Sequence, residues 1–228
     1  MLIRIASILD TDRLAQCRHL LSQGPWIDGG ASAGILAGKA KNNSEINQHD
    51  PIAQKLGEIM VNAMMASPSF QAAALPVRIS PPSFSRYESG QYYGDHNDAA
   101  VLEFQVSGAR MLVRTDLAAT LFISAAEDYD GGELVVEDTF GLTKVKLAAG
   151  DMVLYPASSL HRVQPVTRGV RLVSFLWIQS MVRDDYHRRM LYELDLTIQQ
   201  LHRSATGNPA NLKLVNLYHN LLRHWSET

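Results

Sequence analysis

The sequence predicts a mainly β protein whose core is an antiparallel sandwich or barrel of the jelly-roll kind, with helices before and after it. Between about residues 77 and 181, short strand-like runs alternate with glycine- and proline-marked turns, and no helical pattern intervenes. On both sides of this stretch the apolar residues recur at helical spacing. We therefore predict an N-terminal supporting region at 1–76, a β core at 77–181 and a helical extension at 182–228.

The N-terminal region contains two helical patterns. In "LDTDRLAQCRHLLSQG", Asp10 or Thr11 is a suitable N-cap and Gly24 a suitable stop. In "HDPIAQKLGEIMVNAMMASP", Asp50 is the expected N-cap and Pro51 the first helical residue. The methionines of this second segment lie at helical spacing, which indicates core packing rather than cofactor binding by Met60, Met64 and Met65.

The strand-like runs of the middle region follow each other closely. "LAATLFIS" has the composition of a strand, and "DYDGGELVVED" turns through Gly131 and Gly132 into another. "TKVKLAAGDMVLYP" predicts two short strands about a glycine turn. "HRVQPVTRGVRLVSFLWIQS" predicts a strand, a turn at residues 167–169 and a long apolar strand.

The last region predicts two amphipathic helices, the second with Asn208 as its N-cap and Pro209 as its first residue. Their leucine-rich stripes must be covered by the core, by each other or by a second subunit. We expect this extension to contribute to a homo-oligomer.

Composition describes an ordinary globular protein, with 46% hydrophobic and 19% charged residues among 228. A formal charge of −2 and a pI near 6.4, without a basic stripe, argue against nucleic acid as a partner. No apolar stretch reaches membrane-spanning length, so no membrane partner is expected. The single cysteine, Cys17, excludes an intrachain disulfide framework and favours a reducing compartment, so we predict a cytoplasmic protein.

Three residues of metal-ligating type are candidates for one site. In a strand, His96 and Asp98 would point to the same face, so that their donor atoms could converge. His161, far downstream, offers a third donor. Two histidines and one carboxylate on one face leave three coordination positions open, as non-haem Fe(II) oxygenases require, whereas structural zinc wants four closed ligands. Because H-x-D is frequent by chance, a hydrogen-bonded histidine at a strand end is the alternative for His161.

Arg171 is a candidate anion anchor, ten positions after His161. A hairpin at residues 167–169 would return Arg171 to the level of His161. A buried arginine needs an anion, and its forked donors fit a carboxylate; the alternative is an internal salt bridge. Arg168 is expected to be solvated. The strand parity of Arg171 is shared with apolar neighbours: Val173, Phe175 and Trp177.

The other histidines and one arginine cluster are expected to be solvated residues on helices, caps or the tail. They are His19, His49, His187, His202, His219, His224, Arg183, Arg188 and Arg189.

The stretch "YESGQYYGDHND" matches the pattern Y-x-x-G-x-x-Y-x-x-H-x-D position by position. In this the chain resembles the prolyl hydroxylase branch of the iron- and 2-oxoglutarate-dependent dioxygenases. With "GGEL", "GDMVLYP", His161 and Arg171, the resemblance covers about residues 77–181. "AGKAKNNSEI" and the helical tail are similar to the bacterial PKHD-type hydroxylases, the PiuC group associated with iron uptake, which extends the resemblance to nearly the full length.

The resemblance implies a double-stranded β-helix in which His96, Asp98 and His161 hold Fe(II) and Arg171 holds the distal carboxylate of the co-substrate 2-oxoglutarate. Tyr87 is implied to lie beside the co-substrate. It further implies hydroxylation of an unactivated C–H bond by O2, release of succinate and CO2, and L-ascorbate as an accessory reductant.

Two positions add detail to the resemblance. Tyr93 matches the second tyrosine of the motif and is expected only to pack. Animal oxygen-sensing relatives have a tyrosine that assists the arginine where this chain has Phe122. The hydroxyl partner of Arg171 must therefore come from elsewhere.

Two functions compete. The first is a 2-oxoglutarate-dependent hydroxylase, and the second is a non-catalytic cupin-like iron-binding or sensing domain, which would not need Arg171. A nucleic-acid demethylase would share the triad, but the charge argues against it. The substrate is expected to be a small molecule or a peptide, with a peptide proline, a free amino acid and a siderophore-like molecule all open. "NDAAVLEFQVSGARMLVRTD" is the expected specificity loop.

Overall fold

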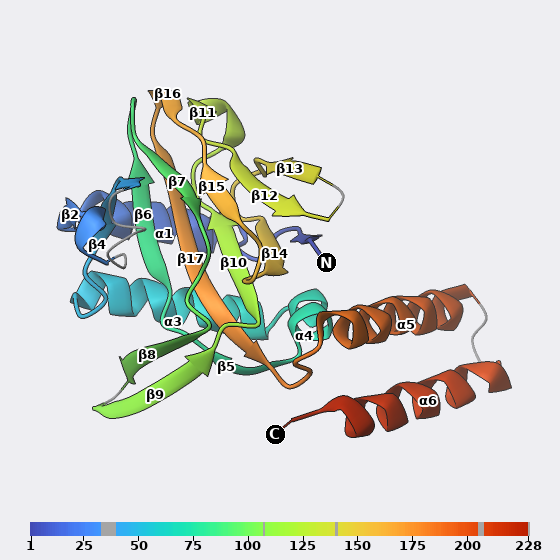
Figure 1. Cartoon of the computed structure of the whole chain (residues 1–228). Coiled ribbons are helices and arrows are strands. Elements are labelled where there is room, and N and C mark those ends of the chain that lie inside the picture. The colour runs from blue at the N-terminus through green and yellow to red at the C-terminus, as the bar shows by residue number, and fades with distance from the viewer. Residues whose placement is uncertain (33–39, 107, 140, 205–207, 228) are drawn as a thin grey trace.

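Two antiparallel sheets face each other across the centre of the molecule, as the computed structural model in Figure 1 shows. The structure describes residues 1–32, 40–106, 108–139, 141–204 and 208–227. A shared cluster of buried side chains joins the two sheets, with Phe122 and Val173 from one and Leu134 and Val163 from the other. This arrangement confirms the predicted jelly roll with flanking helices.

The larger sheet has eight strands in the order β1-β14-β10-β17-β6-β4-β2, and β5 pairs with the end of β17. Its central strand β10 is buried at every position because helices cover one face of the sheet and the second sheet faces the other. The strands are β1 (Ile3–Ile5), β14 (Met152–Pro156), β10 (Leu117–Phe122), β17 (Arg171–Ser180), β6 (Ser83–Tyr87), β4 (Ser44–Ile46), β2 (Trp26–Asp28) and β5 (Pro76–Ile79).

The smaller sheet has five strands in the order β13-β12-β15-β7-β3. They are β13 (Gly141–Val145), β12 (Leu134–Asp138), β15 (His161–Val163), β7 (Tyr92–His96) and β3 (Lys41–Asn42). The two short strands predicted in "TKVKLAAGDMVLYP" exist as β13 and β14, but they belong to different sheets. The turn between them is therefore a crossover between sheets.

Two further strand pairs extend from this core: β11 (Tyr129–Gly131) with β16 (Val166–Gly169), and β8 (Val101–Val106) with β9 (Ala109–Arg114). The expected turn at 167–169 is therefore wrong, because these residues belong to β16. The segment after Asp98 forms the β8–β9 hairpin. Its base is closed by Thr115, whose hydroxyl donates to Ala99 O at 2.6 Å and whose amide donates to Ala100 O at 3.0 Å.

Helices α1 (Thr11–Ser22), α3 (Pro51–Met65) and α4 (Pro68–Ala74) cover the outer face of the larger sheet. The predicted caps are present, since Asp10 accepts from Arg13 N and Asp50 from Ile52 N. Short 3-10 turns lie at Gly29–Ser32 and Ala126–Asp128. Met60 and Met64 are buried, as predicted, but Met65 is 42% exposed because it lies in the last helical turn, away from the core.

The C-terminal helices α5 (Asp185–Ser204) and α6 (Pro209–Trp225) form a hairpin that projects from the side of the barrel (Figure 1). They pack on a small cluster of Leu75, Val182 and Leu191, and the predicted cap Asn208 accepts from Ala210 N. The expectation that Arg188 is solvated is wrong. Its side chain is 1% exposed, because it turns back into the junction and donates to Val182 O at 2.7 Å and Asp185 Oδ1 at 2.8 Å.

None of the helices in the described part of the chain combines the length and the apolar character needed to cross a bilayer.

Candidate active site

The three predicted metal ligands meet at one end of the smaller sheet. His96 is the last residue of β7, Asp98 follows it, and His161 opens β15 directly opposite His96 in the register. One ligand atom from each residue lies within 4.8 Å of the others. The strand itself ends at His96, so the turn after β7, rather than strand alternation alone, brings Asp98 to the site.

Backbone carbonyls orient both imidazoles. His96 Nδ1 lies 2.8 Å from Gly94 O, and His161 Nδ1 lies 3.0 Å from Ser159 O. An Nδ1–H that donates to a carbonyl leaves Nε2 deprotonated, which is the form that binds a metal. His161 Nε2 lies 3.9 Å from Asp98 Oδ1.

The electrostatics of the triad call for a cation. Burial, with a further contribution from His161, lowers the pKa of His96 to about 4, so its imidazole is neutral near pH 7. Burial also raises the pKa of Asp98, against the opposing effects of His161 and the nearby Trp177 indole. Asp98 Oδ2 is buried and has no hydrogen-bond partner among the residues that the structure describes. Two imidazole nitrogens and a carboxyl oxygen that lacks a described hydrogen-bond partner fit a divalent ion such as Fe(II).

Arg171 reaches the same cavity from the larger sheet. It opens β17, where it pairs with Tyr87 of β6, and it is 1% exposed. No carboxylate among the described residues forms an ion pair with it, and its Nε has no hydrogen-bond partner. The proposed hairpin return toward His161 is wrong, because β15 and β17 lie in different sheets. Arg171 instead faces the triad across the interior.

Gly132 makes room for this arginine. Its φ of +65° is a conformation that residues with a Cβ rarely adopt. A Cβ at this position would lie 3.0 Å from Arg171 Cδ and 2.9 Å from Val166 Cγ2. The second glycine of "DGGEL" therefore allows the turn and also leaves space for the Arg171 side chain.

Aromatic residues surround the Arg171 guanidinium, whose Cζ lies 5.1 Å from the ring centre of Tyr87 and 5.6 Å from that of Phe122. Burial raises the pKa of Tyr87 to about 12, although Arg171 opposes the shift. Burial likewise raises the pKa of Tyr129, and Arg171 again opposes the shift. The Tyr129 hydroxyl is buried without a hydrogen-bond partner within the described chain. Both Phe122 and Tyr129 thus lie beside Arg171, but only Tyr129 of these two carries a hydroxyl group.

One cavity of about 1130 Å³ is lined by Arg171, Tyr87 and all three residues of the triad. Its lining also includes Tyr155 and residues of β2, β4, β8 and the middle of β17. Residues 102–104 of the hairpin line it, so the segment predicted to set specificity does border the cavity, although as a strand. Tyr93, expected only to pack, lines it too and stacks on His96, with ring centres 3.6 Å apart.

The sequence did not single out several of these residues. Tyr129 and Tyr155 stand in strand-like runs where a tyrosine normally indicates packing. Lys41 and Glu45, an ion pair in the cavity wall at 2.6 Å, stand in "AGKAKNNSEI", a stretch that indicated the family but gave no sign of a place in the site. The position of Tyr155 within "GDMVLYP" carried a signal, since it shares strand parity with the buried Val153.

Comparison with protein families gives two matches. The 2OG-Fe(II) oxygenase superfamily matches residues 82–179, and the PKHD-type hydroxylase C-terminal domain matches residues 185–227. The chain is 49% identical over 228 residues to a PKHD-type hydroxylase of Parvibaculum lavamentivorans, covering 100% of both chains. It is 48% identical over 227 residues to the PKHD-type hydroxylase PiuC of Pseudomonas aeruginosa, again covering 100% of both.

Solved structures share the architecture at low identity. A prolyl-4-hydroxylase from Pseudomonas putida aligns with a TM-score of 0.55 and 19% identity, covering 78% of this chain and 92% of that one. A prolyl hydroxylase from Trichoplax adhaerens aligns with a TM-score of 0.54 and 13% identity, covering 83% and 86%. These two comparisons establish the fold alone.

Proposed function

This chain belongs to the PKHD-type hydroxylases of the 2OG-Fe(II) oxygenase superfamily, and from that premise we propose that it hydroxylates an unactivated C–H bond of its substrate. Membership makes it a 2-oxoglutarate-dependent dioxygenase. In the proposed reaction, one atom of O2 enters succinate as 2-oxoglutarate loses CO2, and the other enters the substrate as a hydroxyl group.

The observation that carries this proposal is the buried Arg171, which shares a cavity with the triad and forms no ion pair with any carboxylate of the described residues. A guanidinium that is removed from water without a carboxylate is costly unless a ligand supplies one. A dicarboxylate that contacts Arg171 with one end and the metal with the other would supply the counter-charge of Arg171 and further ligands of the metal. A non-catalytic iron-binding domain has no use for this anchor.

We assign a role to each residue of the site. His96, Asp98 and His161 would hold Fe(II), which when bound supplies the activation of O2. The carbonyls of Gly94 and Ser159 keep both histidines in the metal-binding tautomer.

At the inner end, Arg171 would hold the distal carboxylate, with Tyr87 beside it. The buried apolar side chains around them, Leu134, Val163 and Val173, would exclude water from the reacting end of the co-substrate.

The finer expectations from the sequence are kept as proposals. Ascorbate as an accessory reductant and a link to iron uptake rest on the resemblance. A cytoplasmic location rests on the single cysteine, Cys17, which is buried. The exclusion of nucleic acid rests on the formal charge of −2 without a basic stripe.

Arg171→Ala tests the proposal most directly. Loss of one partner of a buried charge pair costs roughly 2–5 kcal/mol, so the affinity for 2-oxoglutarate should fall about 30- to 5000-fold while iron binding is retained. Arg171→Lys should be intermediate, because it keeps the charge and loses the fork. The measurement is an anaerobic titration of 2-oxoglutarate into the Fe(II)-loaded protein, followed by the metal-to-ligand charge-transfer band.

Arg168→Ala is the matched control, because Arg168 is solvent-exposed and pairs with Asp130 at 2.6 Å. It should bind 2-oxoglutarate like the wild type. If Arg171→Ala binds 2-oxoglutarate with wild-type affinity, Arg171 is not the anchor of the distal carboxylate. Oxygen-dependent formation of succinate by the wild type, with and without Fe(II), separates the enzyme from a non-catalytic iron protein.

A further inference from the structure

The cavity has room for more than the co-substrate and the metal ion of the proposed function. Its volume of about 1130 Å³ exceeds what a small dicarboxylate and a metal ion fill, since pockets of roughly 300–1,000 Å³ accommodate drug-sized ligands. We call the part of the cavity that is lined by Ile27, Lys41, Glu45, Phe104, Phe175 and Trp177 its outer half. This outer half is the space left for the substrate.

One wall of the outer half is aromatic. The rings of Phe175 and Trp177 meet edge to face with centres 5.5 Å apart, and Phe104 of the hairpin lies 6.3 Å from Trp177. Phe175 and Trp177 are only half-buried, so part of each ring faces the cavity. Tyr93, stacked on His96, continues this wall toward the triad. Such a surface gains most from a flat or cyclic apolar group that can stack on it.

The buried charges in the lining of the outer half, those of Lys41 and Glu45, compensate each other, and Lys41 Nζ also lies 5.8 Å from the ring centre of Phe175. Lys41 Nζ lies 2.6 Å from Glu45 Oε1, and these side chains are only 4% and 9% exposed. Glu45 also accepts from Ser85 Oγ at 3.1 Å. At the rim, Glu103 pairs with Arg110 at 2.6 Å.

Asp28 is a further acidic residue of the lining, and it is solvent-exposed at the rim. A charge in water interacts weakly with a ligand deeper inside. Arg171 and the triad are committed to the co-substrate and the metal in the proposed function. Among the described residues that line the outer half, the buried charges therefore sum to zero, which leaves no buried counter-charge there for an ionic group.

From this arrangement we propose that the outer half of the cavity takes an uncharged, ring-bearing group of the substrate. The inference rests on the proposed function and narrows its substrate. A charged group would lose its hydration there without gaining a counter-charge, whereas a neutral ring would gain stacking and apolar contact. Among the substrates that the sequence left open, a free amino acid, which carries an ammonium and a carboxylate group on its α-carbon, fits worst.

Three probes test the preference for an uncharged group: benzamide, benzoate and benzylammonium. Each carries the same benzene ring, and they differ in charge. Each is titrated into Zn(II)- and 2-oxoglutarate-loaded full-length protein, which does not turn over, and binding is followed by ligand-detected saturation-transfer NMR. Benzamide should bind saturably and at least about tenfold more tightly than either ion, a difference of about 1.4 kcal/mol. N-acetyl-phenylalanine amide, run in parallel, shows whether a ring carried on a peptide backbone enters equally well.

Two variants and one control test whether the probe binds in the outer half. Phe175→Ala should weaken benzamide at least about fivefold, while Tyr186→Ala, at an exposed aromatic residue of α5, should not change it. Glu45→Gln removes the carboxylate beside Lys41 and should shift the preference toward benzoate.

Tighter binding of either ion than of benzamide, or failure of benzamide to bind, overturns the inference. The same samples report 2-oxoglutarate binding separately. Protein that binds 2-oxoglutarate but not benzamide contradicts only this inference, whereas protein that does not bind 2-oxoglutarate contradicts the proposed function.

Discussion

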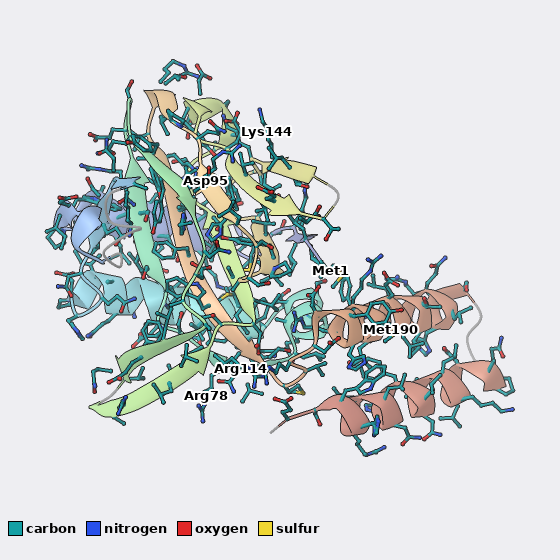
Figure 2. All side chains as sticks on the ribbon, viewed as in Figure 1. Met1, Arg78, Asp95, Arg114, Lys144 and Met190 are labelled. Carbon is teal, nitrogen blue, oxygen red and sulfur yellow. The ribbon has the colours of Figure 1, made fainter. Side chains whose placement is uncertain are left out.

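Strand β10 and helix α6 lie at opposite extremes of packing in this molecule. All six residues of β10 are buried between the helices and the second sheet, whereas α6 contains no fully buried residue, and its Leu212 is 75% exposed. Figure 2 shows the same contrast, with side chains filling the barrel interior and radiating into solvent around the helical hairpin.

This difference indicates how each region is held in place. In the barrel, close packing on both faces of the larger sheet fixes each side chain, so the triad and Arg171 are placed by a rigid surround. The hairpin depends instead on a few contacts at its junction, above all those of Leu191 and Arg188. Substitutions in the two regions should therefore have different consequences.

The largest effect is expected in the barrel. His161→Ala should reduce metal affinity by more than about 100-fold, because two protein ligands hold a labile divalent ion poorly. The rigid surround should keep the variant folded. Anaerobic Fe(II) titration and thermal unfolding check the two halves of this prediction. His219→Ala, on the exposed side of α6, serves as the control, and undiminished iron in His161→Ala would remove that residue from the triad.

An intermediate effect is expected at the junction. Arg188→Ala should lower the free energy of unfolding by roughly 1–3 kcal/mol, because Val182 O and Asp185 lose a buried donor. Its neighbour Arg189 makes an exposed pair with Glu193 at 2.8 Å, so Arg189→Ala should cost less than about 0.5 kcal/mol. Urea denaturation measures both. Equal losses in the two variants would show that the junction does not hold the hairpin.

The smallest effect on stability is expected at the exposed leucines of α6. The homo-oligomer stays a prediction, and Leu212 and Leu217 are the residues through which a second copy would act. Leu212→Gln with Leu217→Gln should change the free energy of unfolding by less than about 0.5 kcal/mol and yield the single-chain mass of 25.3 kDa in light scattering. A wild-type protein that already has this mass would contradict the prediction.

Much of the site could be predicted because its residues carry local signals. His96 and Asp98 stand in a twelve-residue motif with five defined positions, of which they occupy two. The inward orientation of Arg171 was predicted from strand parity, which it shares with apolar residues. The sheet to which each strand belongs carries no such signal. Alternation sets the face that a side chain occupies, whereas pairing depends on the path of the whole chain. For this reason the sequence predicted the strands β13 and β14 but not that they belong to different sheets, and the predicted approach of Arg171 to His161 through a hairpin was wrong.

Arg188 shows a second limit. Its charge and its helical position both favour solvent, and only the sharp turn between β17 and α5 brings buried carbonyls within its reach. Tyr129 is similar, because its position beside Arg171 follows from the pairing of β11 with β16. Contacts between residues far apart in sequence decide both cases.

The closed base of the β8–β9 hairpin has a consequence for how substrate range can change among such proteins. Thr115 bonds to the two residues that follow Asp98, and beside it Arg114 (Figure 2) is held by Asp116 at 2.7 Å and by Glu227 at 2.9 Å. The loop that carries Asp98 is thus fastened at the base of the hairpin, whose residues 102–104 border the cavity. We therefore expect that changes in the outer part of the hairpin leave Asp98 in place. On this expectation, the hairpin is a module that can vary while the centre of the site stays the same.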